Sequence, residues 1–217
     1  MFLRAFTKQY NLQLLPAAHT GIRLGNLVWK PFWGLPKLSH PGLPNHISNA
    51  LYNVGLLDKA QWSDYLKSFE IKMCRNAKLA RIKIQGATEV AATLLEGMGF
   101  GFEQQHLVET EISKVCAKVM DNASRVQLDA YLERLEPKLL RALFRNPRKA
   151  FMITELYYGT LTIKVEKDHE AAFEQNVMNT NWPIRTTLHA NKNHEYTFDH
   201  NDVPFAYKME RIHRFSG

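Results

Sequence analysis

The 217-residue chain is 45% hydrophobic and carries 28 Lys and Arg against 21 Asp and Glu, a net charge of +7. This composition supports one full hydrophobic core, so we expect a single domain over residues 1–217. The least polar stretch, residues 86–102, contains Glu89 and Glu96, and the first ten residues contain Arg4 and Lys8. We therefore expect neither a membrane-spanning helix nor a signal peptide, and a protein that is soluble and cytoplasmic.

The front of the chain is predicted to begin with a helix and to continue with strands. Met1–Tyr10 has apolar side chains on one side and two basic ones on the other, which is typical of a short amphipathic helix. Ile22–Trp29 alternates in the manner of a strand, and residues 47–54 show helical spacing that Gly55 ends. Two further strands are expected, at Phe69–Arg75 and Leu79–Gln85.

An aromatic turn follows the first predicted strand. Residues 30–37 read KPFWGLPK, which places Phe32 and Trp33 on a Pro- and Gly-rich turn between two lysines. Aromatic rings favour the boundary between lipid headgroups and acyl chains, and lysines attract the phosphates there. The pattern indicates a turn that touches a membrane. The alternative is a loop that folds back so that the two rings cover the core.

The basic excess lies in the same part of the chain. Residues 1–100 hold 12 Lys and Arg against 5 Asp and Glu, whereas residues 151–217 hold 7 against 9. A basic surface of this kind suits nucleic acid or the anionic cytoplasmic leaflet of a membrane. The alternative is a solvated basic face that has no partner.

The back of the chain is predicted to hold strands on either side of one long helix. Leu107–Val119 alternates as a strand, and leucines spaced by three and four residues predict the clearest helix of the chain between Leu128 and Leu143. The remaining segments are expected to be a strand, a polar irregular stretch and a closing strand: Phe151–Glu166, residues 167–200 and Val203–Ile212.

The sequence contains no catalytic motif. Nine histidines are scattered without HExxH spacing, and Cys74 and Cys116 form no metal-ligand pair. His194 and His200 lie near acidic residues, which is a weak pattern for a metal site. No nucleophile elbow, P-loop or dinucleotide fingerprint occurs. We therefore expect no enzymatic activity, no metal and no cofactor.

Taken in order, these features resemble the pore-forming domain of the gasdermin family. The first helix and the strand that ends in KPFWG are similar to that family's first helix and its aromatic first hairpin loop. Tyr131–Glu166, YLERLEPKLLRALFRNPRKAFMITELYYGTLTIKVE, resembles a long helix followed by a strand with a "vvTE" core, which here is Met152–Glu155. The closing segment Asp202–Ile212, DVPFAYKMERI, is similar to the family's final strand.

The resemblance implies an α+β fold with a central, twisted, mainly antiparallel sheet flanked by helices. It also implies that Leu79–Val119 and Thr160–Asn201 are amphipathic stretches able to refold into membrane β-hairpins. A spanning strand needs about 9–11 residues with alternating faces, and the first stretch is long enough for two such strands and a turn. Glycines among its apolar residues fit an irregular element in the soluble form. The alternative is an ordinary sheet with a loop.

The function that the resemblance implies is a pore-forming protein, which binds acidic membrane lipids, oligomerises and permeabilises the membrane to cause cell death. The predicted lipid-binding residues are basic and the predicted membrane anchors aromatic: Arg4, Lys8, Lys30 and Lys37, and Phe2, Phe6, Phe32 and Trp33. The expected partners are an anionic phospholipid membrane, at the inner leaflet of the plasma membrane, and other copies of the chain or a related variant, without nucleic acid. The alternative function is a nucleic-acid-binding module that stacks bases on the aromatic turn.

Two departures from the family pattern concern how pore formation would be controlled. The first residues contain no cysteine for the lipidation of some bacterial gasdermins, and five residues follow Ile212. We therefore expect no inhibitory domain or tail, as in the short fungal regulator-of-cell-death members. Control by assembly with a related variant is the hypothesis that follows, and a trimmed sequence is the alternative.

Overall fold

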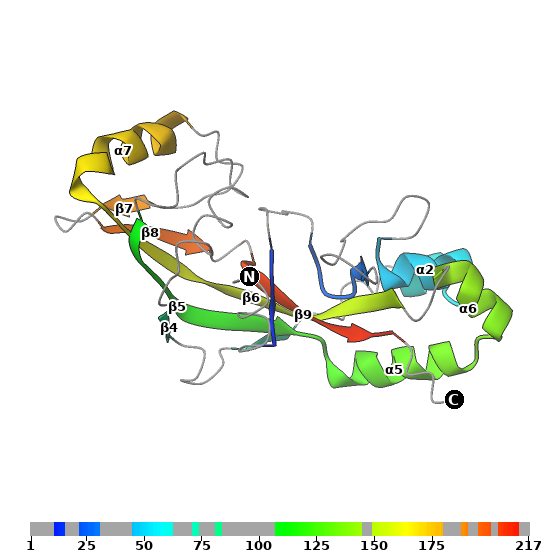
Figure 1. Ribbon diagram of the computed structural model, residues 1–217. Helices are drawn as coiled ribbons and strands as arrows, with labels where there is room; N and C mark the ends of the chain where they lie inside the picture. Colours follow the sequence, from blue (N-terminus) through cyan, green and yellow to red (C-terminus); the bar gives the residue numbers. More distant parts are fainter. Residues whose placement is uncertain are drawn as a thin grey trace. The chain divides into compact units, whose positions relative to one another are not determined.

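The computed structural model describes residues 11–15, 22–30, 45–62, 71–73, 81–83, 107–144, 149–179, 188–190, 195–200 and 204–212 (Figure 1). Within these residues the chain is α+β, with nine strands in one sheet and with antiparallel pairing in the strand pairs given below. The predicted fold class is therefore confirmed. Refolding into membrane β-hairpins stays a prediction, and the predicted helix at Met1–Tyr10 lies outside the described residues.

Strands and helices alternate irregularly along the chain. The strands are β1 (Gln13–Leu14), β2 (Leu27–Trp29), β3 (Ile71–Met73), β4 (Arg81–Lys83), β5 (Leu107–Val119), β6 (Ala150–Val165), β7 (Leu188–Ala190), β8 (Glu195–His200) and β9 (Ala206–Arg211). The helices are α2 (Ile47–Asn53), α5 (Asn122–Glu133), α6 (Pro137–Phe144), the 3-10 turn η3 (Lys167–His169) and α7 (Glu170–Asn179). In the sheet the order is β1-β9-β6-β5-β3; β2 and β8 also pair with β6, β4 with β5, and β7 with β8. None of the described helices is long and apolar enough to cross a membrane.

The chain divides into two compact units. The first comprises residues 1–22, 73–117 and 157–207, and the second comprises residues 23–72, 118–156 and 208–217. Strands β3, β5, β6 and β9 each contribute residues to both units. The single domain expected over residues 1–217 stays a prediction.

In the first unit, the second half of β6 pairs with β8, from Gly159 opposite His200 to Lys164 opposite Glu195. The neighbouring strand β5 approaches β6 closely at the glycine. A Cβ atom at Gly159 would lie 3.0 Å from the carbonyl oxygen of Ser113. A side chain at this position would therefore push the backbone of β5 away by a few tenths of an ångström, so β5 and β6 pack tightly here.

Helix α7 packs on β8 through an aromatic contact, with the ring centres of Phe173 and Tyr196 4.6 Å apart. The Tyr196 hydroxyl lies 3.1 Å from a carboxylate oxygen of Glu170 and 3.2 Å from one of Glu174, and burial together with these carboxylates raises its pKa. Residues 167–200 thus contain η3, α7, β7 and β8, so the prediction that this stretch is irregular is wrong. Among the α7 residues whose burial is described, Phe173 alone is buried, so the helix has almost no apolar periodicity to detect.

In the second unit, β2 pairs with the first half of β6, with Val28 opposite Phe151. Strand β2 is shorter than the predicted Ile22–Trp29, because Gly25 lies in a turn with φ +86°, a backbone conformation that favours glycine. Apolar side chains of β2, α2, α5 and β6 form the core of this unit: Leu27, Val28, Ile47, Ala50, Leu51, Leu128, Leu132 and Ile153 are all buried.

His46 connects the turn before β2 to the start of α2. Its Nε2–H donates to the carbonyl of Leu24 at 2.7 Å, and its Nδ1 accepts from the backbone N–H of Ser48 at 3.1 Å, which caps the helix. A Cβ atom at Gly25 would lie 2.6 Å from Nε2, so the ring packs directly on that glycine. Burial lowers the pKa of His46 to about 4, although the bond to Leu24 opposes that shift.

The long helix predicted between Leu128 and Leu143 is two helices. Helix α5 ends at Glu133 and α6 begins at Pro137, its first residue. Proline fits the first turn of a helix but disfavours helical geometry in the residue before it, so it separates the two. Leu139, one of the periodic leucines, has a side chain that is 42% exposed.

Candidate functional site

Basic residues stand where β2 ends, β6 begins and β9 ends. The backbone N–H of Lys30, just after β2, donates to the carbonyl of Lys149, just before β6, at 3.0 Å. The Lys30 ammonium lies 6.0 Å from the centre of the Phe151 ring, and the Arg211 guanidinium carbon lies 5.7 Å from the same centre. The electron-rich face of an aromatic ring attracts cations. We call Lys30, Lys149 and Arg211 the basic cluster.

The basic cluster has the chemistry of an anion site. Lys30 and Arg211 are exposed and Lys149 is partly exposed. Like charges repel, so an anion placed among them is attracted by all three, and ammonium and guanidinium groups both bind phosphate oxygens well. Within the part of the chain that the structure describes, no group of His, Cys, Asp and Glu is arranged to hold a metal ion.

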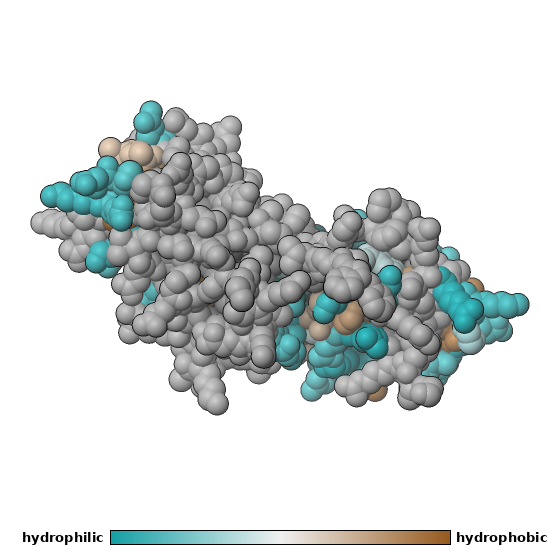
Figure 2. Space-filling model, in the orientation of Figure 1, coloured by the Kyte–Doolittle hydropathy of each residue, from teal (hydrophilic) through white to brown (hydrophobic). Residues whose placement is uncertain are grey.

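Helix α6 presents a second basic surface. Lys138, Leu139 and Arg141 are exposed, while Phe144 at the end of the helix is fully buried. Figure 2 shows hydrophilic and hydrophobic residues next to each other at the end of the view where α6 lies. A helix with an exposed mixture of cations and leucine is suited to a lipid–water boundary.

One of the eight predicted site residues, Lys30, lies in the described part of the chain. The other seven fall outside it: Arg4, Lys8, Lys37, Phe2, Phe6, Phe32 and Trp33. The structure adds Lys149 and Arg211 to Lys30, and the sequence analysis missed both. No local pattern indicates them, because pairing between distant strands brings them together.

The Met152–Glu155 segment of β6 ends in a buried carboxylate, Glu155, that forms an ion pair with β9. Glu155 is 5% exposed, and its Oε1 accepts a hydrogen bond from the Lys208 ammonium of β9 at 2.8 Å. A buried carboxylate needs such a partner, because burial removes the water that would otherwise solvate its charge. The pair therefore ties β9 to β6.

We expect Lys208→Met to lower the free energy of unfolding by about 2 kcal/mol, because it leaves the Glu155 carboxylate without its ammonium partner. This loss is smaller than the loss expected for a fully buried ion pair, because 31% of the Lys208 side chain is exposed to solvent. The double variant Glu155→Gln/Lys208→Met should recover most of the loss. Urea denaturation measures both. Lys164→Met, at a half-buried lysine of the same sheet, is the control, and an equal loss there would contradict the role of the ion pair.

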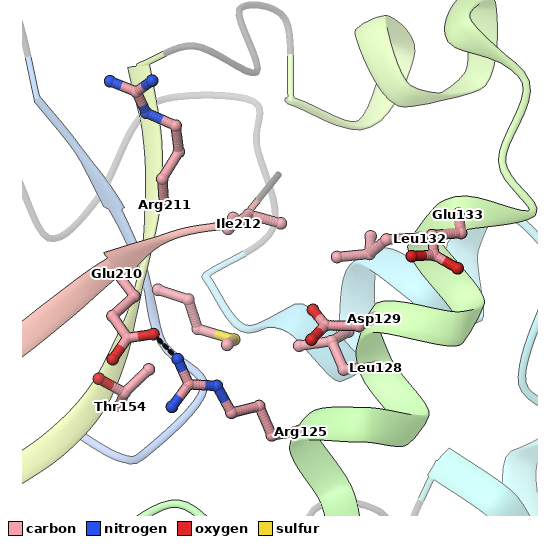
Figure 3. Close-up of a pocket in the computed structure, with 10 residues that line it drawn as sticks. Arg125, Leu128, Asp129, Leu132, Glu133, Thr154, Glu210, Arg211 and Ile212 are labelled. Atoms are coloured by element: carbon pink, nitrogen blue, oxygen red, sulfur yellow. Dashed lines mark hydrogen bonds and ion pairs between the residues drawn. The ribbon is translucent and has the colours of Figure 1, made fainter. Parts of the chain in front are cut away.

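A pocket of about 370 Å³ lies between α5 and the strands β6 and β9 in the second unit (Figure 3). The Arg125 guanidinium donates a hydrogen bond to the Glu210 carboxylate across it. The Thr154 hydroxyl is buried and has no hydrogen-bond partner among the residues that the structure describes, a state that costs about 1–3 kcal/mol. The lining residues are Arg125, Leu128, Asp129, Leu132, Glu133, Met152, Thr154, Glu210, Arg211 and Ile212.

Comparison with known proteins gives one informative likeness. No family model matches the chain, and no curated protein matches it. Among solved structures, it is similar to a bacterial gasdermin from Bradyrhizobium tropiciagri, with a TM-score of 0.51 and 14% sequence identity over 95% of this chain and 84% of that one. At this identity the likeness establishes the fold. The chain therefore has the fold of a bacterial gasdermin, as the sequence resemblance predicted.

Proposed function

We propose that this protein binds anionic membranes, oligomerises on them and makes them permeable, as a pore-forming protein of the gasdermin kind. The observation that carries the proposal is the gasdermin fold, which extends over 95% of the chain. The proposal includes assembly with further copies or with a related variant, passage from the cytoplasm to the inner leaflet of the plasma membrane, and cell death as the outcome. It contains no catalytic step.

The basic cluster supports attraction to an anionic surface. Lys30 is the first residue of the KPFWGLPK segment, so in sequence the cluster directly precedes the aromatic pair, Phe32 and Trp33. Each Lys or Arg close to an anionic membrane contributes about 1 kcal/mol. Phosphate binding at the cluster would therefore hold the membrane next to the aromatic pair.

Vesicle leakage tests the proposed function directly. We expect the protein to release dye from vesicles that contain acidic phospholipid and to release much less from vesicles of neutral lipid, because the basic surface supplies much of the attraction. Fluorescence dequenching of an encapsulated dye measures the release. Equal leakage from both vesicle types, or none from either, would contradict the proposal. Tight binding to single-stranded DNA without leakage would instead support the nucleic-acid alternative.

We expect the charge reversal Lys30→Glu/Arg211→Glu to weaken binding to anionic vesicles more than tenfold, at about 1 kcal/mol for each cation lost and more for its replacement by an anion. The defect should become smaller as salt rises, because screening removes the same attraction from the parent protein. Vesicle co-sedimentation at several salt concentrations measures it. The matched control is Lys59→Glu/Lys167→Glu, two exposed lysines outside the cluster. A defect that does not depend on salt would indicate misfolding.

A further inference from the structure

The pocket between α5 and the strands β6 and β9 combines a carboxylate, an apolar wall and a buried hydroxyl. We infer that it binds a small organic cation, an ammonium or guanidinium group carried on a short apolar body. The pocket lies wholly in the second unit, and the inference is independent of the proposed function.

The charges around the pocket favour a cation. Its lining holds three carboxylates and two guanidinium groups. One carboxylate, Glu210, is neutralised by Arg125, and the Arg211 guanidinium lies 5.7 Å from the Phe151 ring instead. Figure 3 shows Arg211 directed away from α5. The negative charges of the two α5 carboxylates are therefore not neutralised by the arginines of the lining.

Asp129 and Glu133 are those carboxylates. They lie four residues apart on one face of α5, where like charges destabilise a helix, and both are exposed. Among the described residues neither has a hydrogen-bond or ion-pair partner. Figure 3 shows the Asp129 carboxylate directed from α5 towards the strands. A bound cation would relieve the repulsion and pair with Asp129.

The remaining lining fits the body of such a ligand. Leu128, Leu132, Met152 and Ile212 are buried apolar side chains that would contact an alkyl chain. The Thr154 hydroxyl, 3% exposed and without a partner in the described part of the chain, is able to accept a hydrogen bond from an N–H group as well as to donate one. Pockets of about 300–1,000 Å³ accommodate small molecules, and this one, at about 370 Å³, is at the lower end of that range.

The test is a titration of the full chain, labelled with ¹³C at its methionine methyl groups, with n-butylamine, n-butylguanidinium, butyrate and n-butanol at neutral pH. We expect both cations to shift the Met152 methyl resonance in a saturable way, with affinities in the millimolar range. Butyrate and butanol should bind at least tenfold more weakly. Absence of a saturable shift with either cation, or butyrate binding equal to that of butylamine, would overturn the inference.

Variants assign the contacts. Asp129→Asn should weaken butylamine binding at least tenfold, and Thr154→Val, which removes the unpartnered hydroxyl and keeps the shape, should weaken it severalfold in a stably folded chain. The matched control Glu136→Gln removes an exposed acid outside the pocket and should leave binding unchanged. Equal losses in Asp129→Asn and Glu136→Gln would contradict a specific site.

An ammonium group also occurs in ethanolamine lipid headgroups. One further ligand distinguishes a lipid headgroup from a free amine as the source of the cation. Glycerophosphoethanolamine carries the headgroup without acyl chains. If it binds more tightly than butylamine, the headgroup is the natural source of the cation; if it binds more weakly, a free amine is. Because the titration contains no vesicles, it succeeds or fails separately from the leakage assay.

Discussion

Vesicle leakage is expected to be lost when Phe32 and Trp33 are both replaced by Ser. Burial of each ring at the lipid boundary is worth about 1.5–3 kcal/mol, so the double variant removes roughly 3–6 kcal/mol of membrane binding. Lys30, which precedes the turn, belongs to the basic cluster, so the rings are expected to enter the headgroup layer that the cluster attracts. The thermal midpoint of the soluble fold should stay nearly the same, because the rings are predicted to lie outside the core.

The control for this variant keeps the aromatic character of the turn. In Phe32→Trp/Trp33→Phe the two rings are exchanged, and leakage should remain close to that of the parent protein. Dye release and thermal melting are measured on all three proteins. A large fall of the thermal midpoint in the serine variant would mean that the rings cover the core, which was the alternative interpretation of the turn.

A second large effect is expected from acid, through His46. Its ring is 5% exposed and neutral, with Nδ1 accepting from Ser48 and Nε2–H donating to Leu24. Protonation of Nδ1 removes the acceptor that caps α2 and places a charge in a buried position beside Arg23, whose charge also lowers the His46 pKa. The folded protein therefore resists protonation of this ring.

The direction of the pH effect follows from the two pKa values. In the unfolded chain the pKa of His46 is the ordinary 6.5, and in the folded chain it is about 4. Stability from the neutral ring is fully present above pH 6.5 and is lost as the pH falls towards 4. The loss between these limits is about 3 kcal/mol, since one pKa unit corresponds to about 1.4 kcal/mol.

Urea denaturation of the parent protein and of His46→Asn, at pH 7, 5 and 4, measures this contribution. Asparagine still caps a helix but does not titrate, so the variant should be less stable at pH 7 and should lose about 3 kcal/mol less on acidification. His169→Asn, at a half-exposed histidine of η3, should keep the pH dependence of the parent. If the slope with pH is the same in His46→Asn as in the parent, another group is responsible.

The sequence alone predicted the parts of the fold that depend on local pattern. Residues 107–119 and the second half of 151–166 show strand-like alternation, and β5 and β6 lie within one residue of the predicted bounds. Helix α2 ends before Gly55, whose φ of +74° is natural for glycine. These features are encoded by neighbouring residues, so side-chain periodicity and glycine positions reveal them.

Local pattern gave wrong predictions where packing or a single residue decides the outcome. The leucine spacing continues past Glu133, yet Pro137 starts a separate helix and leaves Leu139 exposed. Helix α7 was missed because contacts with β8, through Phe173 and Tyr196, hold a helix that lacks a clear apolar face. In both cases the feature that sets the structure, a proline or a tertiary contact, is not part of the hydrophobic periodicity of the sequence.

The sequence by itself determined the class of fold and the basic excess of the front of the chain, and it predicted Lys30 as a lipid-binding cation. Tertiary structure decided the rest. Strand pairing brings the backbones of Lys149 and Lys30 together, and Arg211 shares the Phe151 ring with Lys30. The position of α5 beside β6 and β9 places Thr154, Asp129 and the Arg125–Glu210 pair around one pocket. The physical reason is that a binding site depends on distances between side chains far apart in the chain. Composition and periodicity describe neighbours along the chain, whereas the pairing of β2 and β9 with β6 sets those distances.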